Sequence, residues 1–148
     1  MIGKKQILEA GKEIMSRAAI EIPRDYKQGI QNMVAEEEEE LSRFVLLSML
    51  ENWDAAEEDR RAMCADTGVP RYFVKAGNEA RIEGGFVALE HMLRLATAEA
   101  TQEVPLRPNR VHPLSRRDNN NNVGINAPEI EFSFEPDADW IDVTTVHK

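Results

Sequence analysis

The chain has 148 residues and a mass of 16.8 kDa, which is the size of one ordinary domain. It carries 27 acidic and 18 basic residues, and 42% of its residues are apolar, as is typical of a folded rather than a disordered chain. No stretch approaches the roughly 20 apolar residues of a membrane-spanning helix, and the first residues are too charged for a secretory signal. We therefore expect a cytoplasmic location and no membrane partner. The single cysteine, Cys64, excludes an internal disulfide and any metal site built from several thiolates of this chain.

The formal charge of −9 is unevenly distributed. Residues 1–62 carry −5, residues 63–118 carry +1 and residues 119–148 carry −5. Non-specific binding to nucleic acid depends on clustered Lys and Arg side chains, so this distribution argues against a nucleic-acid partner. The middle segment nevertheless contains four arginines within eleven residues that include no acid: Arg107, Arg110, Arg116 and Arg117. Such a cluster suits a small anion better than a polyanion.

The first 62 residues are expected to form a helical part. Apolar side chains recur every three or four positions from Gln6 to Ile20, which predicts an amphipathic helix, and residues 25–35 predict a second, shorter one. A third, long helix is predicted to run toward Arg61. We interpret the acidic run at residues 36–40 as its solvated first turns, since carboxylates favour the positive end of the helix dipole.

Residues 63–148 are expected to form the α/β part of the same domain. Residues 71–76 predict a strand, and Gly84 and Gly85 introduce a helix. Alternating apolar residues predict two more strands, 130–134 and 140–146, joined by a short turn as a hairpin. The expected fold class is α/β, of mixed α+β type: N-terminal helices, then a small sheet with a covering helix that looks incomplete as a domain.

Cys64 lies between a predicted helix and a predicted strand, beside polar, turn-forming residues that include Asp66. Three interpretations stay open from the residues alone. The thiol is a small buried apolar group, a nucleophile with His112 as its base, or a ligand of an iron–sulfur cluster.

Arg107 stands between two prolines in a segment, residues 104–128, that shows neither helical nor strand periodicity. Prolines restrict the backbone on either side, and a guanidinium on a stiff loop is suited to bidentate capture of a carboxylate. An ordinary surface arginine beside a turn is an equally good interpretation of this pattern.

The segment Cys64–Gly68, with the sequence CADTG, resembles the CxDTG segment of the iron–sulfur hydro-lyases, in the alpha-type catalytic region of class I fumarate hydratase and L(+)-tartrate dehydratase. Further segments resemble motifs of this family in the same order: Pro105–Asn109 with Val111–Leu114, then Asn122–Gly124 with Ala127–Pro128, and finally Asp142–Lys148. The resemblance extends from about residue 41 to residue 148.

The resemblance implies a [4Fe–4S] cluster held by three cysteines, of which Cys64 is the first. It also implies that Asp66 lies beside the substrate as a catalytic residue, and that Arg107 binds a substrate carboxylate. The implied reaction is the reversible addition or removal of water from a small dicarboxylate of the fumarate, malate or tartrate type.

Two further cysteine ligands are absent from the chain. We therefore expect the N-terminal half of an alpha-type region, inactive alone, which works with the rest of that region or a beta-type subunit in an oligomer. The alternative is a non-catalytic fragment that serves as an acidic helical interaction module through residues 1–62.

Overall fold

The computed structural model describes residues 1–64 and 69–147. The chain divides into two compact units, which are considered separately. One combines Met1–Ala18 with Asp66–Lys148, and the other is Ala19–Ala65. Among the described residues, no helix has both the length and the apolar character needed to cross a membrane.

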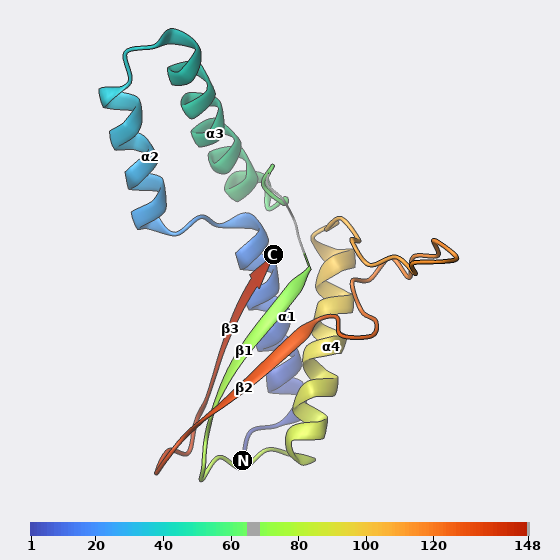
Figure 1. The fold of residues 1–148 in the computed structure, drawn as a ribbon. Coiled ribbons are helices and arrows are strands. Elements are labelled where there is room, and N and C mark those ends of the chain that lie inside the picture. Colours follow the sequence, from blue (N-terminus) through green and yellow to red (C-terminus); the bar gives the residue numbers. More distant parts are fainter. Residues whose placement is uncertain (65–68, 148) are drawn as a thin grey trace. The chain divides into compact units, whose positions relative to one another are not determined.

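The first unit is built on a three-stranded sheet in the order β2-β1-β3 (Figure 1). The central strand β1 (Pro70–Gly77) pairs in parallel with β2 (Glu129–Glu135) and antiparallel with β3 (Ile141–His147). Helix α4 (Gly85–Glu103) lies between β1 and β2 in the sequence, because parallel neighbours need a crossover connection.

Helices α1 (Lys4–Ile20) and α4 cover one face of this sheet (Figure 1). The core beneath them is formed by alternate side chains of β1 and one face of α4: Tyr72, Val74, Ala76, Leu89, Leu93, Ala96 and Ala100. Gly11 lets α1 approach α4 closely, since a Cβ there would lie 2.9 Å from the Cβ of Ala96.

The other face of the sheet carries charged side chains. Arg71 forms an ion pair with Glu129 across the β1–β2 ladder, and Lys75 forms one with Glu135. Strand β1 therefore alternates between the apolar core and a polar face, as its period-2 pattern requires.

The second unit is a pair of helices, α2 (Arg24–Glu36) and α3 (Glu40–Asp59). Trp53, Ala56 and Met63 form its small core. Glu39 caps α3 by accepting a hydrogen bond of 2.6 Å from the backbone N–H of Ser42, and this bond lowers the pKa of the Glu39 carboxyl group.

The mixed α/β class is confirmed, and the seven predicted helices and strands are all present, with boundaries that differ from the expected ones by a few residues. The acidic run was wrongly assigned to the start of α3. Glu36 ends α2, residues 37–39 lie between the helices, and only Glu40 of the run belongs to α3.

The predicted hairpin is also wrong. Strands β2 and β3 do not pair with each other, because β1 lies between them. The segment 136–140 instead crosses the end of β1, where the backbone N–H of Gly77 donates to the carbonyl of Trp140 at 2.8 Å.

Candidate functional site

Cys64 is exposed, while the backbone on which it sits is fixed. Its N–H donates a hydrogen bond of 2.8 Å to the side-chain Oδ1 of Asn52 on α3. The preceding residue, Met63, is buried and donates its N–H to the carbonyl of Ala19 at 3.0 Å. The interpretation of Cys64 as a buried apolar thiol is therefore wrong, and the sulfur is presented on an anchored segment.

An apolar cleft of about 730 Å³ adjoins Cys64 within the helical unit. It is lined by Tyr26, Phe44, Met49 and Trp53, together with Met63 and Cys64 itself. The rings of Tyr26 and Trp53 lie 6.0 Å apart at its wall. The thiol thus stands at the border between solvent and an aromatic surface.

Arg107 lies in the other unit, on the loop that follows α4. Its side chain is exposed, whereas the preceding Leu106 is only 4% exposed and donates its N–H to the carbonyl of Thr101 at 2.9 Å. The loop is therefore anchored to the C-terminal turn of α4, directly before the arginine.

Asn122 holds the same loop on the far side of Pro108. The Asn122 Oδ1 accepts a hydrogen bond of 2.8 Å from the N–H of Asn109, and its Nδ2 donates to the carbonyl of Arg107 at 3.2 Å. The sequence offered only a run of four asparagines here, and spacing alone could not distinguish this buried one from its neighbours.

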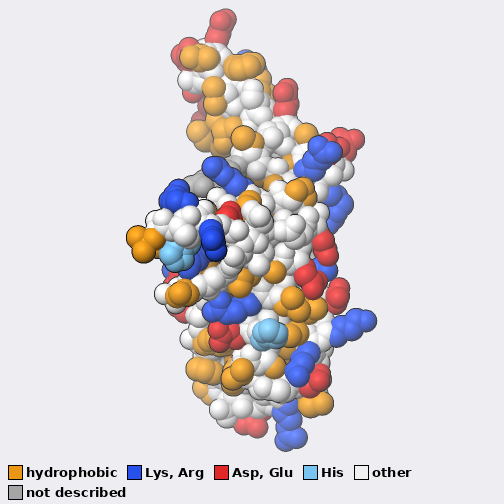
Figure 2. Space-filling view, turned by 90° about the vertical axis from the view of Figure 1, so that its right-hand side faces the viewer, with side chains coloured by type: hydrophobic (Ala, Val, Ile, Leu, Met, Phe, Trp, Pro, Cys, Tyr) orange, Lys and Arg blue, Asp and Glu red, His pale blue; other side chains and the backbone are white. Residues whose placement is uncertain are grey.

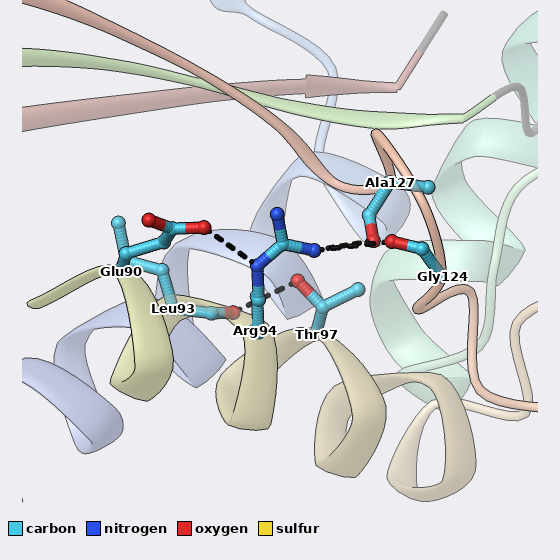
Figure 3. Close-up of polar contacts among 6 residues, drawn as sticks. All are labelled: Glu90, Leu93, Arg94, Thr97, Gly124 and Ala127. Atoms are coloured by element: carbon cyan, nitrogen blue, oxygen red, sulfur yellow. Dashed lines mark hydrogen bonds and ion pairs between the residues drawn. The ribbon is translucent and has the colours of Figure 1, made fainter. Parts of the chain in front are cut away.

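Arg94 holds the next turn of the loop from the middle of α4 (Figure 3). Its Nη1 donates to the carbonyls of Gly124 at 3.2 Å and Ala127 at 3.0 Å, and its Nε donates to the Glu90 carboxylate at 3.0 Å. Sequence analysis did not identify this residue, because an arginine on a helix is most often a solvated one.

The four arginines found in the sequence share this loop, and Figure 2 shows basic side chains gathered where it faces the viewer. Arg107, Arg116 and Arg117 are exposed, and Arg110 is half-buried over Gly124. A groove of about 940 Å³ runs along the loop, with Arg110 and Arg117 in its wall and no Asp or Glu among its described lining residues. The local potential therefore favours an anion.

His112 also lines this groove. Its Nδ1 accepts hydrogen bonds from the backbone N–H groups of Leu114 at 3.3 Å and Ser115 at 3.1 Å. These bonds fold the segment 112–115 around the imidazole, so His112 helps to hold the shape of the loop.

Comparison with known proteins assigns the chain to a family. The profile of the family described as fumarate hydratase (Fumerase) matches residues 8–148. The chain belongs to the fumarate hydratase family. This membership confirms the resemblance found in the sequence motifs.

The curated relatives that this chain matches are considerably longer than the chain itself. A protein of Methanocaldococcus jannaschii, provisionally named L(+)-tartrate dehydratase subunit alpha, is 38% identical over 127 residues, which are 86% of this chain and 44% of that protein. The L(+)-tartrate dehydratase subunit alpha of Escherichia coli strain K12 is 28% identical over 118 residues, which are 80% of this chain and 38% of that protein. The chain thus spans less than half the length of these relatives.

The predicted site residues are found in different parts of this structure. Cys64 belongs to the helical unit and Arg107 to the sheet unit, while Asp66 lies outside the described residues. Within the described part of the chain, no group of three or more His, Cys, Asp or Glu side chains is placed to hold a metal ion. The resemblance implies three cysteine ligands for a cluster, and this chain has one cysteine. Its residues therefore do not hold such a cluster by themselves.

Proposed function

We propose that this chain supplies part of the alpha-type catalytic region of a [4Fe–4S]-dependent hydro-lyase that adds water to, or removes it from, a small dicarboxylate. The observation that carries the proposal is the family match over residues 8–148, which includes all the motif segments. The exposed thiol of Cys64 and the groove that carries Arg110 and Arg117, with no Asp or Glu among its described lining residues, support it independently.

Cys64 is the proposed cluster ligand of this chain. Its sulfur is accessible and its backbone is anchored by Asn52, so a metal–thiolate bond would require little rearrangement of the chain. Two more thiolates must come from outside these 148 residues. When bound, such a cluster supplies an iron that acts as a Lewis acid on the substrate hydroxyl group. Exposed thiolates of this kind require a reducing compartment such as the cytoplasm.

Arg107 is the proposed partner of one substrate carboxylate. The anchoring of Leu106 and Asn109 limits the motion of the backbone that carries the guanidinium. A planar guanidinium binds a carboxylate through two parallel hydrogen bonds, which fixes the orientation of the substrate as well as holding it. Asp66, as the family resemblance implies, is proposed to act beside the substrate.

The names of the relatives indicate the partner. Both are called subunit alpha, so we propose that a beta-type subunit, or the remainder of the alpha region, completes the site in an oligomeric enzyme.

The test is anaerobic reconstitution of the chain together with the polypeptide that supplies the other thiolates. Cys64→Ser should abolish the broad visible absorption of the cluster, and a cluster that survives this change would remove Cys64 from the ligand set.

Arg107→Ala should raise the KM for the dicarboxylate by roughly 10- to 100-fold at unchanged iron content, since one charge-assisted contact is lost. Arg81→Ala, which removes an exposed arginine elsewhere, is the matched control.

One observation favours the alternative of an interaction module. Helix α3 exposes the apolar side chains of Leu41 and Phe44, each about two-thirds accessible in this structure. In that case the chain would bind a protein through α3 and take up no iron with any completing polypeptide. Iron uptake that depends on Cys64 contradicts this alternative.

A further inference from the structure

Four buried polar side chains of the sheet unit form a connected series. Tyr72 and Thr97 are 0% exposed, Thr101 is 2% exposed and Asn122 is 3% exposed. Buried polar groups lower the free energy of unfolding unless they are hydrogen-bonded. A series of them in a core is therefore stable only when each member has a hydrogen-bond partner.

The series begins at the central strand and runs along α4. The Tyr72 hydroxyl lies 3.0 Å from the Thr97 Oγ1, which itself donates to the carbonyl of Leu93 at 2.9 Å, so Tyr72 is the donor. The Oγ1 of Thr101 donates to the carbonyl of Thr97 at 2.7 Å and accepts from the Nδ2 of Asn122 at 3.3 Å. The amide of Asn122 is thereby fixed to the core of the sheet unit.

The series ends at the loop of Arg107. Asn122 contacts the backbone on both sides of Pro108, through the carbonyl of Arg107 and the N–H of Asn109. Thr101 reaches the same loop through its carbonyl, which accepts from the N–H of Leu106. Two backbone groups around the arginine are thus held by the buried side chain of Asn122, and a third, the N–H of Leu106, is held by the backbone of Thr101.

We infer that Asn122, held by Thr101, is the positioning residue for Arg107. The inference rests on the proposed role of Arg107 in binding a substrate carboxylate. Asn122 fixes the direction from which the exposed guanidinium extends, so the loop does not have to be ordered when the substrate binds.

The first test uses the 148-residue chain and needs no cluster. Amide hydrogen exchange is measured residue by residue in the parent chain and in Asn122→Ala. The Asn109 amide should lose most of its protection, while the Leu106 amide, bonded to Thr101, should keep it. A uniform loss of amide protection across the sheet unit would indicate that Asn122 has a purely structural role. Unchanged protection of the Asn109 amide would show that its hydrogen bond to Asn122 does not form. Either result overturns the inference.

The second test is a double-mutant cycle in the reconstituted enzyme. Asn122→Ala should raise the KM roughly tenfold with little change in kcat, and should have no further effect when Arg107 is already alanine. Equal effects in both backgrounds would show that Asn122 does not act through Arg107. Thr101→Val should reproduce part of the effect and Thr101→Ser should not, because serine keeps the hydroxyl that Asn122 bonds. Asn78→Ala, an exposed turn asparagine, is the matched control.

The two ideas can fail separately. An unchanged KM in Arg107→Ala contradicts the proposed role of Arg107, whatever Asn122 does. A raised KM in Arg107→Ala with a normal KM in Asn122→Ala overturns only the positioning role.

Discussion

The backbone carbonyl of Ala138 lies directly over Gly77. A Cβ built on Gly77 would stand 2.2 Å from that carbonyl oxygen, well inside van der Waals contact. The contact exists because the segment 136–140 crosses the end of β1 on its way from β2 to β3, and the N–H of Glu79 donates to the same carbonyl at 2.8 Å. Because glycine has no Cβ, the segment 136–140 can cross the end of β1 at this position, and β3 can then pair with the edge of β1 opposite β2.

Gly77→Ala should lower the free energy of unfolding by about 1–3 kcal/mol or more, because backbone rather than a flexible side chain must move. Gly29→Ala is the matched control. A Cβ at Gly29 meets nothing within 4 Å in the interior of α2, so this change should raise stability by about 0.5–1 kcal/mol. Urea unfolding of the three chains measures both effects, and a neutral Gly77→Ala would contradict the tight crossing.

Burial raises the pKa of the Tyr72 hydroxyl from 10.0 to about 12. Between these values Tyr72 is ionised in the unfolded chain but not in the folded chain. The contribution of its neutral hydroxyl to the free energy of unfolding is therefore complete below pH 10 and is lost as the pH rises toward 12. The loss amounts to at most about 3 kcal/mol. Tyr72→Phe should therefore be less stable than the parent at pH 8, by about 1 kcal/mol, and should lose less stability between pH 10 and 12. If the free energy of unfolding of both chains fell by the same amount between pH 10 and 12, this would be evidence against the buried hydroxyl.

Arg94→Ala should loosen the turn at residues 124–127. The change leaves two carbonyls, those of Gly124 and Ala127, without their guanidinium donor, and we expect a loss of about 1–3 kcal/mol in urea unfolding. Glu90→Ala is the control, because it removes only a half-exposed pair within α4 and should cost at most about 0.5 kcal/mol. Similar losses for both variants would show that the contact with the turn contributes nothing.

Cys64 should react rapidly with a thiol reagent in the folded chain. Its sulfur is exposed, so labelling with Ellman's reagent should be complete without denaturant, at a rate close to that of the unfolded chain. Asn52→Ala frees the backbone N–H of Cys64 but leaves the sulfur exposed, so it should change this rate little. Labelling that requires denaturant would contradict the described position of Cys64.

The sequence was sufficient for the individual elements and insufficient for their pairing. Helical and strand periodicity are local, so residues 6–20 and 71–76 were located from their own side chains. The strand order depends on which residues meet across 58 positions, as Arg71 and Glu129 do, and local alternation favoured the shorter connection of a hairpin. The start of α3 could likewise not be located within a run of five glutamates.

The residues of the candidate site could be predicted from the sequence only in part, for the same reason. Cys64 and Arg107 stand in recognisable motifs, and the acid-free arginine cluster is visible in composition alone. The contribution of Asn122 is not visible, because it depends on the approach of Thr101 and the Arg107 backbone in space. Arg94 acts at a distance of 30 residues or more, through backbone carbonyls that carry no side-chain signal.

The central position of β1 also has a consequence for synthesis on the ribosome. The partners of this strand are translated late, since Arg71 pairs with Glu129 and, on the other side, with Val146. At roughly 5–20 residues per second, β1 waits several seconds with both edges unpaired. Only α1 and α4 can shield its apolar side during that time. The charges of Arg71 and Lys75 on its other side discourage pairing with a second nascent chain until the proper neighbours emerge.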